Sequence, residues 1–290
     1  MVPHFKQVTI VGVGLIGGSL GMILKRQGMA DAVVGIGRRV HNLKAAVDLG
    51  AIDRFVLDPG EGIRGSDLVI LATPVDAYER QLKAWGPSLT AGAIVSDVGS
   101  VKGPLVEQAE GLLPEGVHFV GAHPVAGREQ TGVAAGSVDL FRGSRCIVTP
   151  TPRTDPQAVK TICELWEAAG STVLSMDPFL HDMVLGAVSH LPHAVAFSLV
   201  TALGEIQEQT LPGQNLLGYG GGGLRDTTRI AASSPEMWRD ICLWNRDNLV
   251  KMIETFERHL AEFKRRVETG DGQGLEQIME RAKRLREQVQ

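Results

Sequence analysis

The chain has 290 residues, of which 43% are hydrophobic and 21% charged, a balance typical of a globular protein with room for two domains. The net charge of -4 disfavours nucleic-acid binding, because nucleic-acid binders normally carry a basic surface. Three separated cysteines without a CxxC pair indicate reduced thiols in a cytoplasmic protein. We expect no signal peptide and no membrane contact, because no apolar stretch approaches the roughly 18 residues of a membrane span.

Short apolar runs alternate with helical patterns along the first part of the chain. The runs predict strands at 8–11, 32–36, 67–72, 93–96, 118–122, 146–149 and 172–174. Apolar strands that alternate with helices indicate a parallel sheet covered on both faces. We therefore predict an α/β fold with an N-terminal Rossmann-type domain.

The pattern changes near residue 176, after which strand-like runs stop. Helical periodicity covers 178–204, 235–267 and 275 to the end. Parts of these helices are apolar most of the way round, which is typical of helices buried in a domain or a subunit interface. We expect a dinucleotide-binding domain over 1–176 and an all-α dimerisation and substrate domain over 177–290.

A G-x-G-x-x-G motif, GVGLIG at 12–17, joins the first strand to the first helix. Its glycines let the backbone approach a pyrophosphate, and the helix N-terminus offers amide groups to it. The alternative is a tight glycine turn that serves packing only. We predict a cofactor site that includes Gly12, Gly14, Leu15, Ile16, Gly17, Thr73 and Pro74.

The second strand ends in Gly37-Arg38-Arg39, where an acidic residue would normally hold the adenosine ribose. Without a carboxylate the usual acceptor for a 2′-hydroxyl is missing, and two arginines can hold a 2′-phosphate. Alternatively, both arginines are solvated loop residues. The cofactor is thus NAD or NADP, with a slight preference for NADP.

Two polar residues follow neighbouring predicted strands. Ser100 lies in DVGSVK and His123 in GAHPVAGRE, both at the carboxyl edge where open α/β sheets bind ligands. A neutral imidazole is well suited to proton removal near neutral pH. We predict a catalytic role for both, although a lone histidine is often a packing residue.

The stretch SHLPH places His190 and His193 on one helix face, beside Pro192, which should disturb the helix locally. This fits a site at the domain interface. We expect no metal, because no carboxylate or cysteine follows at ligand spacing.

The stretch GGGGLRDTTR couples four glycines to a charged cluster. It is either a flexible linker into a helix capped by Asp226, or a site in which Arg225 or Arg229 binds a substrate carboxylate. These residues alone leave both interpretations open.

Taken in order, VGVGLIGGSL, DVGSVK, GAHPVAGRE, SHLPH and GGGLRDTTRIAASSPEMW resemble the prephenate dehydrogenases, oxidoreductases of tyrosine biosynthesis. The resemblance implies a nucleotide-binding domain followed by a helical dimerisation domain, and hence a homodimer. It also implies an oxidative decarboxylation. Hydride passes from C4 of the prephenate ring to the nicotinamide, CO2 leaves C1, and 4-hydroxyphenylpyruvate forms.

The same resemblance implies roles for individual residues. His123 would bond the substrate hydroxyl, Ser100 would help to orient it, and Arg229 would bind a substrate carboxylate. The remaining substrate-binding positions that it implies are His193, Asp226, Glu129, Trp238 and, with less support, His190.

Three rival functions remain. An arogenate dehydrogenase has the same chemistry with an amino group in place of the side-chain carbonyl, and a carboxylate such as Glu129 could favour that amine. A hydroxyacid or imine reductase would share the architecture but would not require the paired histidines and RDTTR together. A nucleotide-sensing binding protein would need none of the four residues Ser100, His123, His193 and Arg229.

Overall fold

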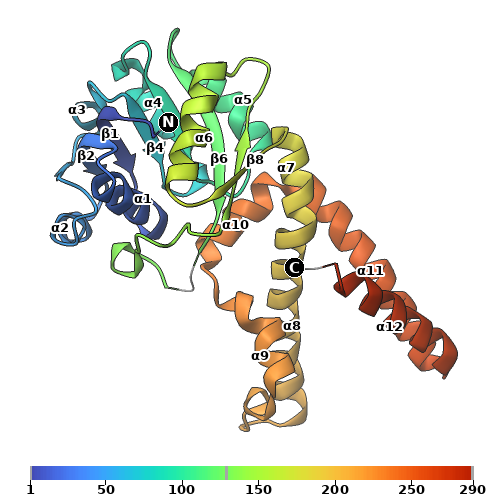
Figure 1. Ribbon diagram of the computed structural model, residues 1–290. Helices are drawn as coiled ribbons and strands as arrows, with labels where there is room; N and C mark the ends of the chain where they lie inside the picture. The colour runs from blue at the N-terminus through green and yellow to red at the C-terminus, as the bar shows by residue number, and fades with distance from the viewer. Residues whose placement is uncertain (1, 128–129, 289–290) are drawn as a thin grey trace.

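The computed structural model describes residues 2–127 and 130–288 (Figure 1). Its first part is an eight-stranded sheet with the order β3-β2-β1-β4-β5-β6-β7-β8. This order reverses between β1 and β4, as in a doubly wound Rossmann-type fold. The strands are β1 Phe5–Val11, β2 Ala30–Ile36, β3 Arg54–Val56, β4 Leu68–Leu71, β5 Ile94–Asp97, β6 His118–Val125, β7 Arg145–Thr149 and β8 Thr172–Ser175.

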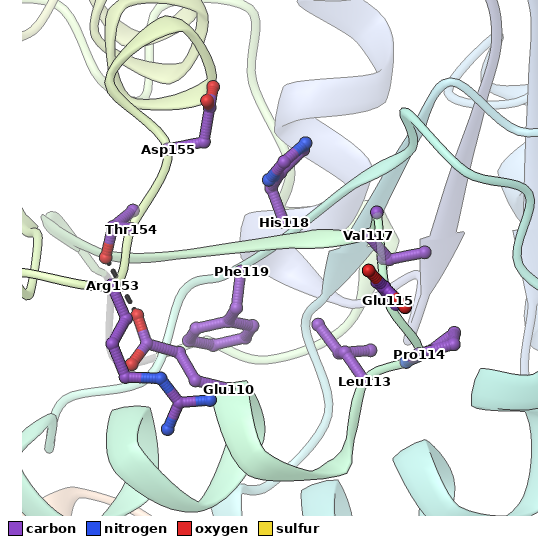
Figure 2. Close-up of a pocket in the computed structure, with 11 residues that line it drawn as sticks. Glu110, Leu113, Pro114, Glu115, Val117, His118, Phe119, Arg153, Thr154 and Asp155 are labelled. Atoms are coloured by element: carbon purple, nitrogen blue, oxygen red, sulfur yellow. Dashed lines mark hydrogen bonds between the residues drawn. The ribbon is translucent and has the colours of Figure 1, made fainter.

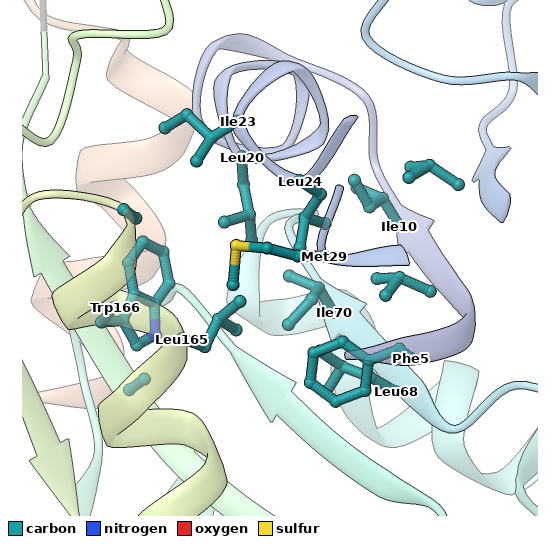
Figure 3. Close-up of a cluster of buried hydrophobic side chains, with 14 of the residues drawn as sticks. Phe5, Ile10, Leu20, Ile23, Leu24, Met29, Leu68, Ile70, Leu165 and Trp166 are labelled. Carbon is teal, nitrogen blue, oxygen red and sulfur yellow. The ribbon is translucent and has the colours of Figure 1, made fainter. Parts of the chain in front are cut away.

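Helices cover both faces of the sheet, as the apolar runs predict. Alternate residues of β4 point to opposite cores: Leu68 and Ile70 lie in one buried cluster, Val69 and Leu71 in the other. Figure 3 shows the first cluster, in which Met29 and Trp166 are also buried. The helices of this part are α1 Leu15–Arg26, α2 Val40–Asp48, α3 Pro59–Ile63, α4 Tyr78–Trp85, α5 Gly103–Leu112 and α6 Pro156–Ala168.

The expectation of a wholly parallel sheet is wrong at one place. β6 and β7 pair antiparallel, with His123 opposite Ile147. The connection between them contains only a short 3-10 turn, Val133–Ala135, in its described residues, and no crossover helix that would return the chain for parallel pairing. The sequence patterns also missed β3, which has three residues and is too short to show a periodicity.

The part after Ser175 consists of helices joined by short connections, with no strand in its described residues. Its helices are α7 Pro178–Leu185, α8 Leu191–Thr210, α9 Gly222–Thr228, α10 Pro235–Trp244, α11 Arg246–Glu268 and α12 Gly272–Arg286. Figure 1 shows α8 with α9, and α11 with α12, as two arms that extend from the sheet. The disturbance expected near Pro192 occurs as a π-helical turn, Gly186–His190, between α7 and α8.

The combined helical run Pro178–Thr210 is long and apolar enough to cross a membrane, with a mean hydropathy of 1.6 over its most apolar window. The expectation that no stretch approaches this length was therefore wrong. Length and composition alone do not separate a membrane span from a helix covered by protein. Three polar side chains of this run, His181, Asp182 and His190, are buried against the rest of the chain.

Candidate active site

The glycine motif forms the turn that its sequence predicts. Gly12 has φ +100°, and a β-carbon there would lie 2.6 Å from the carbonyl oxygen of Ala72. A β-carbon on Gly17 would overlap the carbonyl oxygen of Gly12, so α1 packs closely on the turn. At Gly14, by contrast, a β-carbon would meet nothing within 4 Å, which leaves open space at the start of α1. This is the arrangement that a pyrophosphate requires.

The other predicted cofactor residues lie at the same edge. Arg38 and Arg39 are exposed directly after β2, and Arg39 precedes the first residue of α2. Thr73 and Pro74 follow β4, and the Thr73 hydroxyl donates to the side chain of Gln81. Because β2, β1 and β4 are adjacent and parallel, these residues surround one end of the glycine turn.

Ser100 and His123 extend this row along the sheet. Ser100 follows β5 and is partly buried, and His123 lies near the carboxyl end of β6 and is 7% exposed. β5 pairs in parallel with both β4 and β6. The predicted nucleotide turn and both predicted catalytic residues therefore share the carboxyl edge of one sheet.

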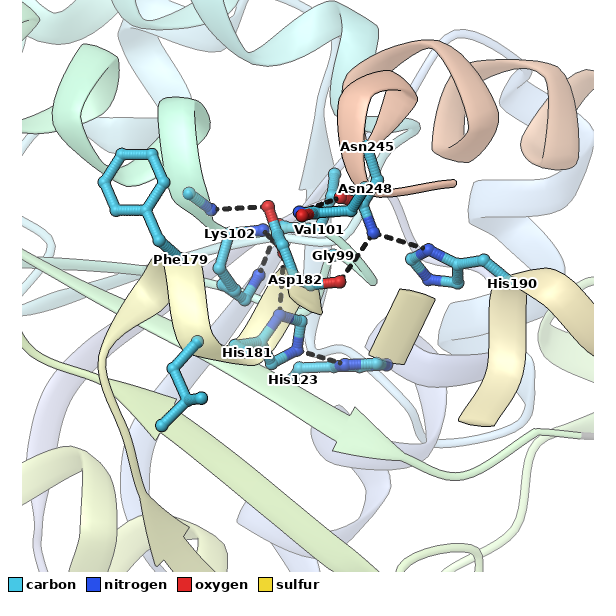
Figure 4. Close-up of polar contacts among 12 residues, drawn as sticks. Gly99, Val101, Lys102, His123, Phe179, His181, Asp182, His190, Asn245 and Asn248 are labelled. Carbon is cyan, nitrogen blue, oxygen red and sulfur yellow. Dashed lines mark hydrogen bonds and ion pairs between the residues drawn. The ribbon is translucent and has the colours of Figure 1, made fainter. Parts of the chain in front are cut away.

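His123 belongs to a chain of buried hydrogen bonds (Figure 4), which we call the relay: His123, His181 and Asp182. Nδ1 of His123 lies 2.8 Å from Nε2 of His181. Nδ1 of His181 lies 2.8 Å from Oδ1 of Asp182. Both members that come from α7 are almost fully buried. His123 is therefore part of a polar network rather than an isolated packing residue.

A buried ion pair supports the loop that carries Ser100. Nζ of Lys102 lies 2.6 Å from Oδ2 of Asp97, and both side chains are fully buried. Asp97 also accepts hydrogen bonds from the backbone amides of Gly99 and Ala122. With its partners satisfied in this way, the pair can be kept in the interior, whereas loss of either residue would strand a buried charge.

These surroundings keep the His123 imidazole neutral. Burial lowers the pKa of His123 well below its ordinary value, and the neighbouring His181, Lys102 and His190 lower this pKa further. A histidine whose pKa lies well below 6.5 is mostly unprotonated at pH 7. His123 can therefore accept a proton under neutral conditions.

A second cluster lies on α8 and α10. The ring of His193 stacks on Trp238, with centroids 3.7 Å apart and an interplanar angle of 23°. Arg229, directly after α9, is close enough to lower the pKa of His193, behind the larger effect of burial. Trp238 itself is buried, whereas Arg229 is exposed. The guanidinium group of Arg229 and the imidazole of His193, which stacks on Trp238, thus lie near one another beside α8.

His190 connects this cluster to the relay. Its ring lies edge-on to Trp238 with centroids 5.8 Å apart. The side-chain amide of Asn245 donates both to Nδ1 of His190, at 2.9 Å, and to the carbonyl oxygen of Asp182, at 2.7 Å. Burial lowers the pKa of His190 to about 4, and its buried Nε2 has no hydrogen-bond partner within the described part of the chain.

The structure does not gather every predicted residue. Asp226 and Arg225 are exposed, and Asp226 lies inside α9, whose cap position is Gly221. The interpretation of Asp226 as a helix cap was therefore wrong, because the helix starts five residues earlier than expected. Glu129 lies outside the described residues.

Sequence reasoning missed several residues that the fold brings to His123: His181, Asp182, Asp97, Lys102 and Asn245. Asp97 and Lys102 stand in the quoted DVGSVK motif, but nothing in the motif showed that they pair. His181 and Asp182 are adjacent in sequence on α7, and only the docking of α7 against α5 and β6 gives them a shared role.

A cavity of about 180 Å³ lies at the opposite edge of the sheet (Figure 2). Its lining includes His118, at the amino end of β6, and Glu110, which accepts hydrogen bonds from Thr151 and Thr154. Because His118 and His123 lie toward opposite ends of β6, this cavity is separate from the relay.

The chain matches two known family models, one for each of its parts. Residues 20–175 match the family model described as prephenate dehydrogenase, nucleotide-binding domain. Residues 177–281 match the model described as prephenate dehydrogenase, dimerization domain. The chain belongs to the prephenate dehydrogenase family.

Similar prephenate dehydrogenases and related enzymes cover nearly the whole chain. The prephenate dehydrogenase of Bacillus subtilis is 35% identical over 97% of this chain and 75% of its own length. The cyclohexadienyl dehydrogenase of Zymomonas mobilis is 33% identical over 92% of this chain and 90% of its own.

Solved structures of the family show the same fold. The prephenate dehydrogenase from Aquifex aeolicus, in complex with hydroxyphenyl propionate and NAD+, superimposes with a TM-score of 0.90 at 39% identity over 98% of both chains. The arogenate dehydrogenase from Synechocystis gives a TM-score of 0.80 at 27% identity over 98% of this chain and 100% of its own. The expected fold, a Rossmann-type sheet followed by a helical dimerisation domain, is confirmed.

Proposed function

We propose that this member of the prephenate dehydrogenase family converts prephenate to 4-hydroxyphenylpyruvate with NAD or NADP as oxidant. The observation that carries the proposal is the neutral, buried His123 on the same sheet edge as the glycine turn. The Aquifex aeolicus relative, with hydroxyphenyl propionate and NAD+ bound, supports a ring-bearing carboxylic acid as substrate.

The chemistry assigns a task to each side chain. A bound dinucleotide would accept the hydride from C4 of prephenate. His123 removes the proton of the C4 hydroxyl as the hydride leaves, and this proton removal makes it easier for C4 to release the hydride. Ser100, on the adjacent loop, orients the same hydroxyl. With the ring oxidised, the C1–CO2 bond breaks and its electron pair completes the aromatic ring.

The helical part supplies the binding groups. Arg229 binds a carboxylate of the dianionic substrate, and its planar fork suits that task. His193 and Trp238 form a wall beside it, supported by their stacked geometry. We keep His190, Asp226 and Glu129 as further proposed substrate contacts.

We propose NADP as the slightly preferred cofactor. The exposed Arg38 and Arg39 after β2 support a site for the 2′-phosphate, and Gly37-Arg38-Arg39 carries no carboxylate for a free 2′-hydroxyl. NAD stays the alternative, supported by the NAD+ bound in the structure of the Aquifex aeolicus relative.

We further propose a cytoplasmic homodimer, without nucleic-acid or membrane partners and with a domain boundary near residue 176. Within one chain α8 buries only Ala196 and α11 only Leu249, although both helices carry many apolar residues. A second copy would cover this surface, which the match to a dimerization domain supports. Three free, at least partly buried cysteines fit a reducing compartment.

The proposed reaction is tested by following NADH or NADPH formation from prephenate and, separately, from arogenate, with each oxidised cofactor in turn. We expect turnover with prephenate to exceed turnover with arogenate. The reverse ratio would identify an arogenate dehydrogenase, as the Synechocystis structure represents within the family. Binding of a dinucleotide without turnover of either acid would identify a nucleotide-sensing protein.

A further inference from the structure

The hydrogen bonds around Asp182 have a fixed direction. Oδ1 accepts from the backbone amide of Lys102 at 2.7 Å, and Oδ2 accepts from the amide of Gly103 at 2.8 Å. These amides stand at the start of α5, where backbone N–H groups and the helix dipole favour a negative charge. An ionised carboxylate only accepts hydrogen bonds. The proton between Asp182 and His181 therefore resides on Nδ1 of His181.

This proton fixes the state of the next ring. Burial lowers the pKa of His181, so that its imidazole is neutral and carries a single ring proton. With that proton on Nδ1, Nε2 of His181 holds a lone pair and accepts. The 2.8 Å contact between the two histidines then requires a proton on Nδ1 of His123. Nε2 of His123 is left with its lone pair.

We propose that His181 and Asp182 are positioning residues that hold His123 in the tautomer with its lone pair on Nε2. This inference rests on the proposed function, in which His123 accepts the proton of the substrate hydroxyl. In that step the O–H bond breaks, Nε2 gains the proton, and the hydride electron pair passes to the nicotinamide. His123 becomes an imidazolium, whose charge the Asp182 carboxylate stabilises through His181.

The packing of α7 against α5 fits this task. A β-carbon on Gly103 would lie 3.0 Å from Oδ2 of Asp182, so the absence of a side chain lets the carboxylate reach the helix start. His181 is 0% and Asp182 2% exposed, which keeps water from competing for their hydrogen bonds. Capping of α5 alone would account for Asp182, but not for the histidine placed between it and His123.

Two substitutions separate the direction of the hydrogen bond from simple packing. His181→Gln can place its amide oxygen where Nε2 lies, and so still accepts from His123. His181→Leu fills the space without accepting. His118→Gln is the matched control, because His118 lies on the same strand as His123, β6, but at the opposite edge of the sheet.

We expect His181→Leu to lower kcat by roughly 10²–10⁴-fold, the range for loss of a proton-accepting group, with little change in KM. His181→Gln should retain most of the wild-type kcat, and His118→Gln all of it. Equal losses in the Gln and Leu variants, with unchanged thermal unfolding, would assign His181 to packing and overturn the proposal.

A direct readout on the wild-type protein does not depend on turnover. ¹⁵N NMR of histidine-labelled wild-type protein, assigned with His123→Asn, reports which ring nitrogen of His123 carries the proton. We expect protonated Nδ1 and unprotonated Nε2. A proton on Nε2 would overturn the relay whatever the substrate. The expected tautomer in a protein that turns over neither acid would uphold the relay while rejecting the proposed function.

Discussion

The imidazole of His193 lies nearly parallel to the indole of Trp238, with ring centroids 3.7 Å apart. Nδ1 of His193 donates to the carbonyl oxygen of Ser189, one helical turn earlier, at 2.9 Å. The ring is thus fixed on one face by the indole and at one edge by the backbone. Burial lowers its pKa, so that the neutral ring presents Nε2 as an acceptor.

Replacing Trp238 tests whether this stack positions His193. Trp238→Phe keeps an aromatic face and should change the KM for prephenate little. Trp238→Leu removes it and should raise KM up to about 10-fold, since aromatic pairs contribute about 0.5–1.5 kcal/mol. Steady-state kinetics beside a thermal unfolding curve measure both effects. Equal KM values in the two variants would show that the stack serves only packing.

His123→Asn tests the proposed base. Asparagine can keep a hydrogen bond but cannot take the proton, so kcat should fall by about 10²–10⁴-fold with a smaller change in KM.

The pH profile of the wild type has a definite sign. Protonated His123 cannot act as a base, so kcat should rise with pH through a single ionisation and then level off. Because burial lowers the pKa of His123, this limb should lie below pH 6.5, the ordinary pKa of a histidine. The Asn variant should lack the limb. If it keeps the limb, another group titrates, and His193 becomes the next candidate.

Arg229→Ala should act mainly on binding. Arg229 is exposed in the single chain, and the bound substrate would bury the charge pair that it forms, so we expect a loss of about 2–5 kcal/mol in substrate affinity, the range for truncating one partner of a buried charge pair. Arg229→Lys should restore it poorly, because an ammonium lacks the planar fork. KM and direct calorimetric binding of a substrate analogue measure the effect. An unchanged KM in the Ala variant would point to the neighbouring Arg225.

The double variant Arg38→Ala/Arg39→Ala tests cofactor preference. If the two guanidinium groups bind a 2′-phosphate, KM for NADP should rise while KM for NAD stays nearly constant. Initial rates at saturating prephenate, with each cofactor varied, give both constants. Equal shifts for the two cofactors, or none, would reduce the pair to solvated surface residues.

The exposed apolar side chains of the helical part predict a dimer in solution. Light scattering at micromolar concentration should give about twice the 31.1 kDa mass of the chain. Leu243→Glu, at a side chain on α10 that is 65% exposed in the single chain, should weaken this association. A fully active monomer would contradict the proposed assembly.

The sequence patterns predict the parts of the fold that depend on local order. Short apolar runs located seven of the eight strands, and the glycine motif located the turn after β1. They could not predict the antiparallel pairing of β6 with β7, because strand direction depends on the path of the connecting segment.

The residues of the candidate site likewise fall into those that the sequence motifs predict and those that only the folded structure reveals. Ser100, His123 and His193 stand in recognisable local motifs, whereas His181 and Asp182 do not. Their importance comes from a tertiary contact between α7 and α5, which no spacing within one helix records. Asp97 and Lys102 are only five residues apart, yet the sequence does not show that they form an ion pair. The pair matters to the structure because both side chains are buried, and burial depends on the folded chain.

One side chain ties the two halves of the molecule together. Asp182 belongs to the helical part, yet its carboxylate holds the first amides of a helix in the sheet part and, through His181, a ring on a strand of that sheet. An isolated sheet domain would keep its glycine turn but lose the counter-charge behind His123. In the mechanism that we propose, cofactor binding is therefore modular, whereas proton transfer is a joint property of both halves. A recombined gene that joined this sheet domain to a foreign helical partner would inherit the first ability without the second.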